Sequence, residues 1–156
     1  MDHQRRCAAR FLAILIVAIS AAPSSHAAQP SVIPYRACFE SAGRYYGISP
    51  VLLEAIALKE SRMNPLAIDH DADGSYDIGI MQINSSHLAE LARLGYPPQV
   101  LWTPCANIAA GAWVLANNMR RMGVTWSAVG AYNSSDPRIG ARYAYGVARY
   151  VMALER

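Results

Sequence analysis

The sequence predicts an all-α fold with one long loop, and three observations support this prediction. Apolar residues recur with the period of a helix in several long segments. Glycine and proline stand at the ends of these segments, where they suit helix ends and helix starts. No two segments combine the alternating pattern and the connecting turn that are typical of a β-hairpin.

The first two helices are predicted from their apolar stripes and their end signals. Residues 35–46 carry apolar side chains on one face, and Gly47 is placed to end that helix. Ser49 and Pro50 then supply an N-cap and a first-turn proline for a helix over residues 51–61.

A loop is expected over residues 64–78, between the second and third helices. It begins there because Pro65 disfavours helical geometry in the residue before it. Four further helical segments are expected within residues 82–95 and over residues 106–122, 126–132 and 139–154.

The N-terminus resembles a secretory signal peptide over residues 1–27. Three arginines precede an apolar run over residues 11–22, and the small-residue segment PSSHAA follows it. The run has 12 residues, fewer than the roughly 20 that a membrane-spanning helix needs. We therefore expect cleavage after Ala27 and export of a single domain, residues 28–156, to the periplasm. An uncleaved signal anchor is the alternative.

The composition after this cleavage excludes one class of partner and indicates a cross-link. Residues 28–156 hold 11 basic and 10 acidic residues, a net charge of +1 with no cationic run, so nothing indicates nucleic-acid binding. Of the cysteines only Cys38 and Cys105 remain, and in an exported chain such a pair indicates a disulfide more than a metal pair or a nucleophile.

One acidic residue interrupts the apolar face of the second helix. Glu60 falls between Leu53 and Ile56 on the helical wheel, whereas Glu54 and Ser61 lie together on the polar side. A carboxylate on a buried face is costly unless it is paired or its pKa has risen enough to keep it neutral. Glu60 is therefore either a paired residue at the edge of the core or a general acid at a helix end beside a loop.

Four segments carry a resemblance to a known family: IALKESRMNP, GIMQIN, GAYN and YGVARYVMAL, in this order. Their order and separations are similar to those of the lytic transglycosylases with the soluble-transglycosylase domain. The resemblance runs from about Cys38 to Leu154 and implies a mostly helical fold of the α+β lysozyme-like superfamily. The chain most resembles the small members that accompany conjugation, type III secretion and type IV pilus systems, which implies partners in such an envelope-spanning machine.

The resemblance also implies roles for single residues. Glu60 matches the catalytic glutamate, and Tyr150 matches a tyrosine whose hydroxyl contacts that carboxyl. The positions that match the sugar-binding groove are Ser61, Gly79, Met81, Gln82, Tyr132 and Asn133. For Met81 and Tyr150, simple packing in the core is the alternative interpretation.

The implied reaction uses one carboxyl group and no cofactor. Glu60 is expected to protonate the oxygen between N-acetylmuramic acid and N-acetylglucosamine in a peptidoglycan strand, while the 2-acetamido group stabilises the developing cation. The carboxylate would then take the proton of the muramoyl C6 hydroxyl, which closes a 1,6-anhydro ring without water.

The segment that begins at Asp69 has two interpretations. Asp69, Asp71 and Asp73 match the start of an EF-hand calcium loop. Such a loop needs a bidentate glutamate at its twelfth position, and this position is Ile80. The favoured interpretation is a turn closed by its own side chains that brings residues 79–82 to the groove, with no metal site.

Two rival functions stay open at this point. A lysozyme-type hydrolase would use Asp77 or Asp73 as its second carboxylate. A non-catalytic wall-binding subunit of a secretion system would keep the groove and would have no need of a glutamate at position 60.

Overall fold

The computed structural model describes residues 33–156, so the predicted signal peptide lies outside the described residues. Its elements, in chain order, are α1 (Arg36–Tyr46), α2 (Pro50–Ser61), β1 (Ile68–His70), β2 (Tyr76–Ile78), β3 (Ile83–Asn84), the 3-10 helix η1 (Ser85–His87), α3 (Leu88–Arg93), the 3-10 helix η2 (Pro98–Trp102), α4 (Pro104–Met122), α5 (Trp126–Gly130) and α6 (Pro137–Leu154). The prediction of a mostly helical domain is confirmed.

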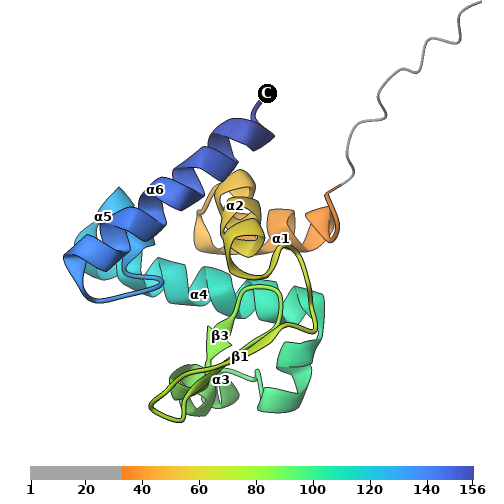
Figure 1. Cartoon of the computed structure of the whole chain (residues 1–156). Coiled ribbons are helices and arrows are strands. Elements are labelled where there is room, and N and C mark those ends of the chain that lie inside the picture. The colour runs from red at the N-terminus through yellow and green to blue at the C-terminus, as the bar shows by residue number, and fades with distance from the viewer. Residues whose placement is uncertain (1–32) are drawn as a thin grey trace, which may run out of the picture. The chain divides into compact units, whose positions relative to one another are not determined.

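The long helix α4 separates two parts of the domain. Figure 1 shows α1, α2 and α6 on one side of α4, and the small sheet with α3 on the other side. On the helical side, α2 packs against both α1 and α6, and α5 packs against α6 and α4. Within residues 33–156, no helix is both long and apolar enough to cross a membrane.

The middle of α2 is covered on several sides. Leu53, Ile56 and Ala57 are completely buried. Glu54 is only 1% exposed, so the prediction that it lies on a polar face is wrong. The reason is that α1 packs over this side of α2 and brings the Arg36 guanidinium to 3.7 Å from the Glu54 carboxylate. Burial raises the pKa of Glu54, and the charge of Arg36 opposes that shift.

A small antiparallel sheet occupies the region expected to be a loop, and the pattern of residues there did not predict its strands. The strands are neighbours in the order β1, β2, β3. Asp77 in β2 lies opposite Asp69 on one side and opposite Asn84 on the other. Strands of two or three residues are too short to show an alternating pattern in the sequence.

The turn between β1 and β2 is closed by its own polar groups. The Asp71 amide donates to the Ser75 carbonyl at 2.9 Å, and Asp73 accepts the Ser75 amide at 2.9 Å. Asp71 also accepts the Ser75 hydroxyl at 2.8 Å. This is the self-satisfied turn that the sequence indicates. Over residues 33–156, no group of three or more His, Cys, Asp or Glu residues is arranged to hold a metal ion.

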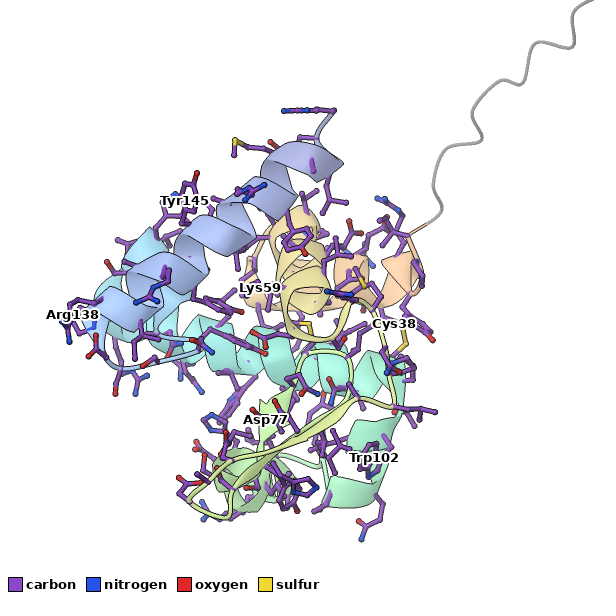
Figure 2. The ribbon with its side chains drawn as sticks, viewed as in Figure 1. Cys38, Lys59, Asp77, Trp102, Arg138 and Tyr145 are labelled. Atoms are coloured by element: carbon purple, nitrogen blue, oxygen red, sulfur yellow. A yellow bond between two sulfur atoms is a disulfide. The ribbon has the colours of Figure 1, made fainter. Side chains whose placement is uncertain are left out.

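The Cys38–Cys105 disulfide is present and joins α1 to the first turn of α4. The two Cα atoms lie 5.1 Å apart, and the bond closes a separation of 67 residues. Figure 2 shows it as the yellow bond beside the label of Cys38. It fixes the N-terminal end of α4, the helix against which both parts of the domain pack.

Replacing both cysteines with alanine should lower the free energy of unfolding by about 4 kcal/mol, because the unfolded chain would no longer be constrained by so long a loop. Urea denaturation of the variant and of the oxidised chain measures this difference. As a control, thiol labelling of the denatured, unreduced full chain should modify Cys7 alone; labelling of Cys38 or Cys105 would contradict the assignment.

Candidate active site

Glu60 lies in the last turn of α2, at the point where the helix gives way to the loop before the sheet. Its side chain is half-buried. Burial is the main cause that raises the pKa of Glu60, to about 7, and the charge of Asp77 adds to the rise. The hydrogen bond from Tyr143 and the charge of Lys59 act in the opposite direction. Near neutral pH the carboxyl can therefore both give and accept a proton, as a general acid and base must.

The hydroxyl of Tyr143, in α6, donates a hydrogen bond to the Glu60 carboxyl. Tyr143 is only 6% exposed, and its ring stacks on that of Tyr132, with centroids 6.4 Å apart and planes at 9°. The Lys59 ammonium lies 5.8 Å from the Tyr143 ring centroid. Tyr143 therefore holds the carboxyl in one orientation, and its own ring is held by the stacked Tyr132 ring and the nearby Lys59 ammonium.

The sequence predicted that Tyr150 makes this contact, and here the structure differs. Tyr150 is partly buried and packs against the core. It lies seven residues beyond Tyr143, about two helical turns and roughly 10 Å along α6. The resemblance pointed to Tyr150, and because seven residues return a side chain to almost the same face, the helical pattern gave no reason to prefer Tyr143.

The turn after β2 forms the floor under Glu60, and Asn107 of α4 holds it. The Asn107 amide oxygen accepts the Met81 amide at 2.8 Å, and its nitrogen donates to the carbonyls of Ile78 and Leu101, both at 2.9 Å. Asn107 is 1% exposed, so these three hydrogen bonds are shielded from water. The sequence analysis missed Asn107; its only signal was a polar residue at the edge of an apolar stripe.

Gly79 is required at its position in this turn for two reasons. Its φ is +78°, in the left-handed region that favours glycine. A Cβ added there would lie 2.2 Å from the Asn107 amide nitrogen. Gly79 therefore permits the close approach of the turn to α4 and does not itself line the cleft.

Ser61 and Met81 also support the turn, although the sequence placed them in the groove. The Ser61 hydroxyl donates to the Ile80 carbonyl at 2.7 Å, which ties the residue after Glu60 to the turn. The Met81 side chain is completely buried and packs on Gly111, where a Cβ would lie 2.7 Å from it. The Met81 carbonyl accepts the Tyr132 hydroxyl at 2.9 Å.

A cleft of about 500 Å³ lies in front of Glu60. Among the residues expected to bind substrate, Gln82, Tyr132 and Asn133 line it. The Gln82 amide nitrogen is fixed by the Gly79 carbonyl at 2.8 Å. A second hollow of about 450 Å³ adjoins the cleft, and both are lined by Glu60 and Asn133. An extended ligand can therefore lie on both sides of the Glu60 carboxyl.

Asp77 contributes a second carboxylate to the same cleft, from the sheet on the opposite wall. Figure 2 shows Asp77 on the sheet and Lys59 on the helical side. Burial raises the pKa of Asp77, whereas a hydrogen bond from Asn84 and the charge of His87 lower it. The turn residue Asp71 also lines the cleft, so the Asp-rich segment does build a wall of the cleft, as the sequence indicated.

The fold defines the class of this domain. It is similar to the X-ray structure of an inactive mutant of the lytic transglycosylase Slt from Pseudomonas aeruginosa, with a TM-score of 0.66 and 21% sequence identity. The similarity covers 78% of this chain and 24% of that chain. The domain therefore has the lysozyme-like fold of a lytic transglycosylase domain. Residues 37–146 match the family described as Transglycosylase SLT domain, and the chain belongs to this family.

Three relatives show how far the sequence similarity extends. The chain is 51% identical over 98 residues to an X polypeptide of Escherichia coli, which covers 62% of this chain and 58% of that protein. It is 44% identical over 112 residues to Invasion protein IagB of Salmonella typhimurium, covering 69% of this chain and 70% of that one. It is 44% identical over 106 residues to Protein IpgF of Shigella sonnei, covering 65% of this chain and 70% of that protein. The matched region thus spans little more than half of the X polypeptide.

Replacing Tyr143 with phenylalanine should raise the pKa of Glu60, because the hydroxyl stabilises the charged form of the carboxyl. Tyr150→Phe, the same change on the same helix, should leave it unchanged. Carbon-13 NMR titration of the glutamate side-chain carboxyls measures both values without relying on activity. If the pKa of Glu60 changed in Tyr150→Phe and not in Tyr143→Phe, the contact predicted from the sequence, between Tyr150 and Glu60, would be correct instead.

Proposed function

We propose that this protein is a peptidoglycan lytic transglycosylase with Glu60 as its acid and base. The observation that carries the proposal is the Glu60 carboxyl itself. It lies where two hollows meet, its pKa is raised to about 7 by burial, and Tyr143 fixes its orientation. A glycan strand could lie across it with the bond to be cleaved beside the carboxyl, and the fold and family support the same substrate class.

In the first step the protonated Glu60 gives its proton to the oxygen between N-acetylmuramic acid and N-acetylglucosamine. The bond from the muramoyl C1 to this oxygen breaks, and N-acetylglucosamine leaves with a free hydroxyl. The oxygen of the muramoyl 2-acetamido group shares its electron pair with C1 and stabilises the positive charge.

In the second step the Glu60 carboxylate takes the proton of the muramoyl C6 hydroxyl. The C6 oxygen then bonds to C1 and displaces the acetamido oxygen, which leaves a 1,6-anhydro ring. The proton is back on Glu60 and no water has been added. A carboxyl with a pKa near neutrality suits both steps, because neither protonation state is strongly disfavoured.

The groove residues have distinct parts in this proposal. Gln82, Tyr132 and Asn133 line the cleft and are proposed to contact the sugars. The turn over residues 78–82 forms the floor of the cleft. It is held in place by contacts of Ser61, Gly79 and Met81, which do not themselves contact the sugars in this proposal.

We also propose where the enzyme acts. The N-terminal residues 1–27 resemble a signal peptide, and peptidoglycan lies outside the cytoplasm, so the domain over residues 28–156 is proposed to work in the periplasm. One relative is named an invasion protein. This supports a role in opening the cell wall for a secretion, conjugation or pilus apparatus.

A lysozyme-type hydrolase is the second candidate, and one observation favours it. Asp77 lies in the same cleft as Glu60, and its charge contributes to the raised pKa of the Glu60 carboxyl. In a retaining or inverting hydrolase, such a second carboxylate acts as a nucleophile or activates water.

Glu60→Gln should lower the rate of glycan cleavage by about 10²-fold or more, because the amide can neither give nor accept the proton. Release of soluble fragments from purified sacculi measures the rate. A folded variant that retains the rate of the natural chain would refute the assignment of Glu60.

The stability of the same variant is its control for folding. An unfolded glutamate loses its proton near pH 4.5, whereas native Glu60 keeps its proton up to about pH 7. Between about pH 4.5 and 7 the native state therefore binds more protons than the unfolded state. Because of Glu60, the free energy of unfolding falls as the pH rises through this range. The Glu60→Gln variant should unfold cooperatively in urea, and its free energy of unfolding should not show the part of the decline with pH that Glu60 causes.

The products separate the two candidate functions. The proposed reaction leaves 1,6-anhydromuramoyl ends, which borohydride cannot reduce, and Asp77→Asn should keep substantial turnover. Mass spectrometry of the released fragments, before and after borohydride, identifies the ends. Reducible ends as the main product, together with a folded but inactive Asp77→Asn variant, would establish the hydrolase instead.

A further inference from the structure

A small hollow of about 280 Å³ opens on the flank of α4, beside the cleft. His87 and Val114 line both this hollow and the cleft, so the hollow adjoins the cleft. The His87 ring lies at the junction, edge-on to the Trp113 ring with centroids 5.8 Å apart. A group attached to a strand in the cleft would have to pass His87 to enter the hollow.

The hollow is lined by two arginines, Arg120 and Arg121. Arg120 donates to the side-chain oxygen of Asn117, and Arg121 donates to that of Asn118 at 2.6 Å. Each guanidinium has five N–H groups, so most of them stay available. Within residues 33–156 neither arginine forms an ion pair, although Glu90 lines the same hollow.

The position of these arginines in the last turn of α4 does not by itself explain their arrangement. Cations favour a helix C-terminus because they interact with its last carbonyl groups. Here each guanidinium instead turns back by one helical turn to a side-chain amide. The two guanidinium groups therefore lie along the flank of α4. Burial is the main cause that lowers the pKa of His87; the charges of Glu90 and Asp77 oppose this shift, and the charge of Arg121 adds to it.

A buried amide provides a second, independent indication of a ligand. The Asn118 residue is 3% exposed, and its side-chain nitrogen has no hydrogen-bond partner. An unpartnered buried N–H group is unfavourable and is uncommon in proteins. Asn118 lines the same hollow as the two arginines. An acceptor bound there would meet donors from the guanidinium groups and would lie close to this unpartnered amide.

We propose that this hollow, formed by Asn117, Asn118, Arg120 and Arg121, binds a carboxylate of the peptide attached to the muramoyl sugar. The proposal rests on the proposed function, because it assigns the peptide of the same substrate to a site beside the cleft. The peptide branches from the sugar, and a hollow that adjoins the cleft is placed to receive such a substituent. Arginine side chains suit carboxylates because they can donate two parallel N–H groups.

The test compares two substrates that differ only in the peptide. One is a glycan strand with its peptides, and the other is the same strand after an amidase has removed them. Arg120→Gln/Arg121→Gln should lower kcat/KM about tenfold or more on the first strand, as expected when charged hydrogen bonds are lost, and should leave the second unchanged. Arg149→Gln, an exposed arginine of α6, is the matched control and should cleave both at the original rate.

A binding measurement separates failure of this inference from failure of the proposed function. Calorimetry with an N-acetylmuramoyl tetrapeptide and with its carboxamide form needs no catalysis. The acid should bind more tightly than the amide to the natural chain, and equally weakly to the double variant. Equal binding of acid and amide, or an equal loss of kcat/KM on both strands, would overturn the inference. Arginine-dependent binding without any anhydro product would refute only the proposed function.

Discussion

The backbone of residues 78–82 is the element on which the proposed site depends, because three separate regions hold it. Asn107 of α4 binds it at two points, Ser61 of α2 binds one of its carbonyls, and the Tyr132 hydroxyl binds the next. Ser61 follows Glu60 directly, and Tyr132 stacks on the tyrosine that contacts the Glu60 carboxyl. The floor of the cleft and the acid are therefore positioned by one connected set of contacts.

Two requirements conflict at Glu60: burial raises the pKa of its carboxyl, but the same carboxyl must stay accessible to the substrate. A fully buried carboxyl would stay protonated and could not be reached, whereas a fully exposed one would ionise well below neutral pH. Glu60 is half-buried at the end of α2, where burial raises its pKa to about 7 and Tyr143 limits the rise. The residue can then change its protonation state twice in one turnover, which is what a reaction with a single acid and base requires.

The sequence predicted the features that depend on long apolar stripes, on end signals and on ordered motifs. These include the helices, the disulfide and the position of Glu60 at a helix end beside a loop. It missed the strands, because two or three residues are too few to show a period. It placed Glu54 on a polar face, because a helical wheel does not show that α1 covers that side. The resemblance assigned the contact with Glu60 to Tyr150, whereas Tyr143 makes it. Both lie on one face of α6, and only tertiary packing decides which side chain reaches Glu60.

The central claim is that the C6 hydroxyl of the sugar, not water, completes the reaction begun by Glu60. Digestion of purified sacculi in oxygen-18-labelled water tests this claim directly, because water that takes part in cleavage leaves its oxygen on the muramoyl end. The account predicts that mass spectrometry finds the new muramoyl ends unlabelled and one water lighter than a reducing end. New ends that carry oxygen-18 would contradict it and would show that the cleft activates water.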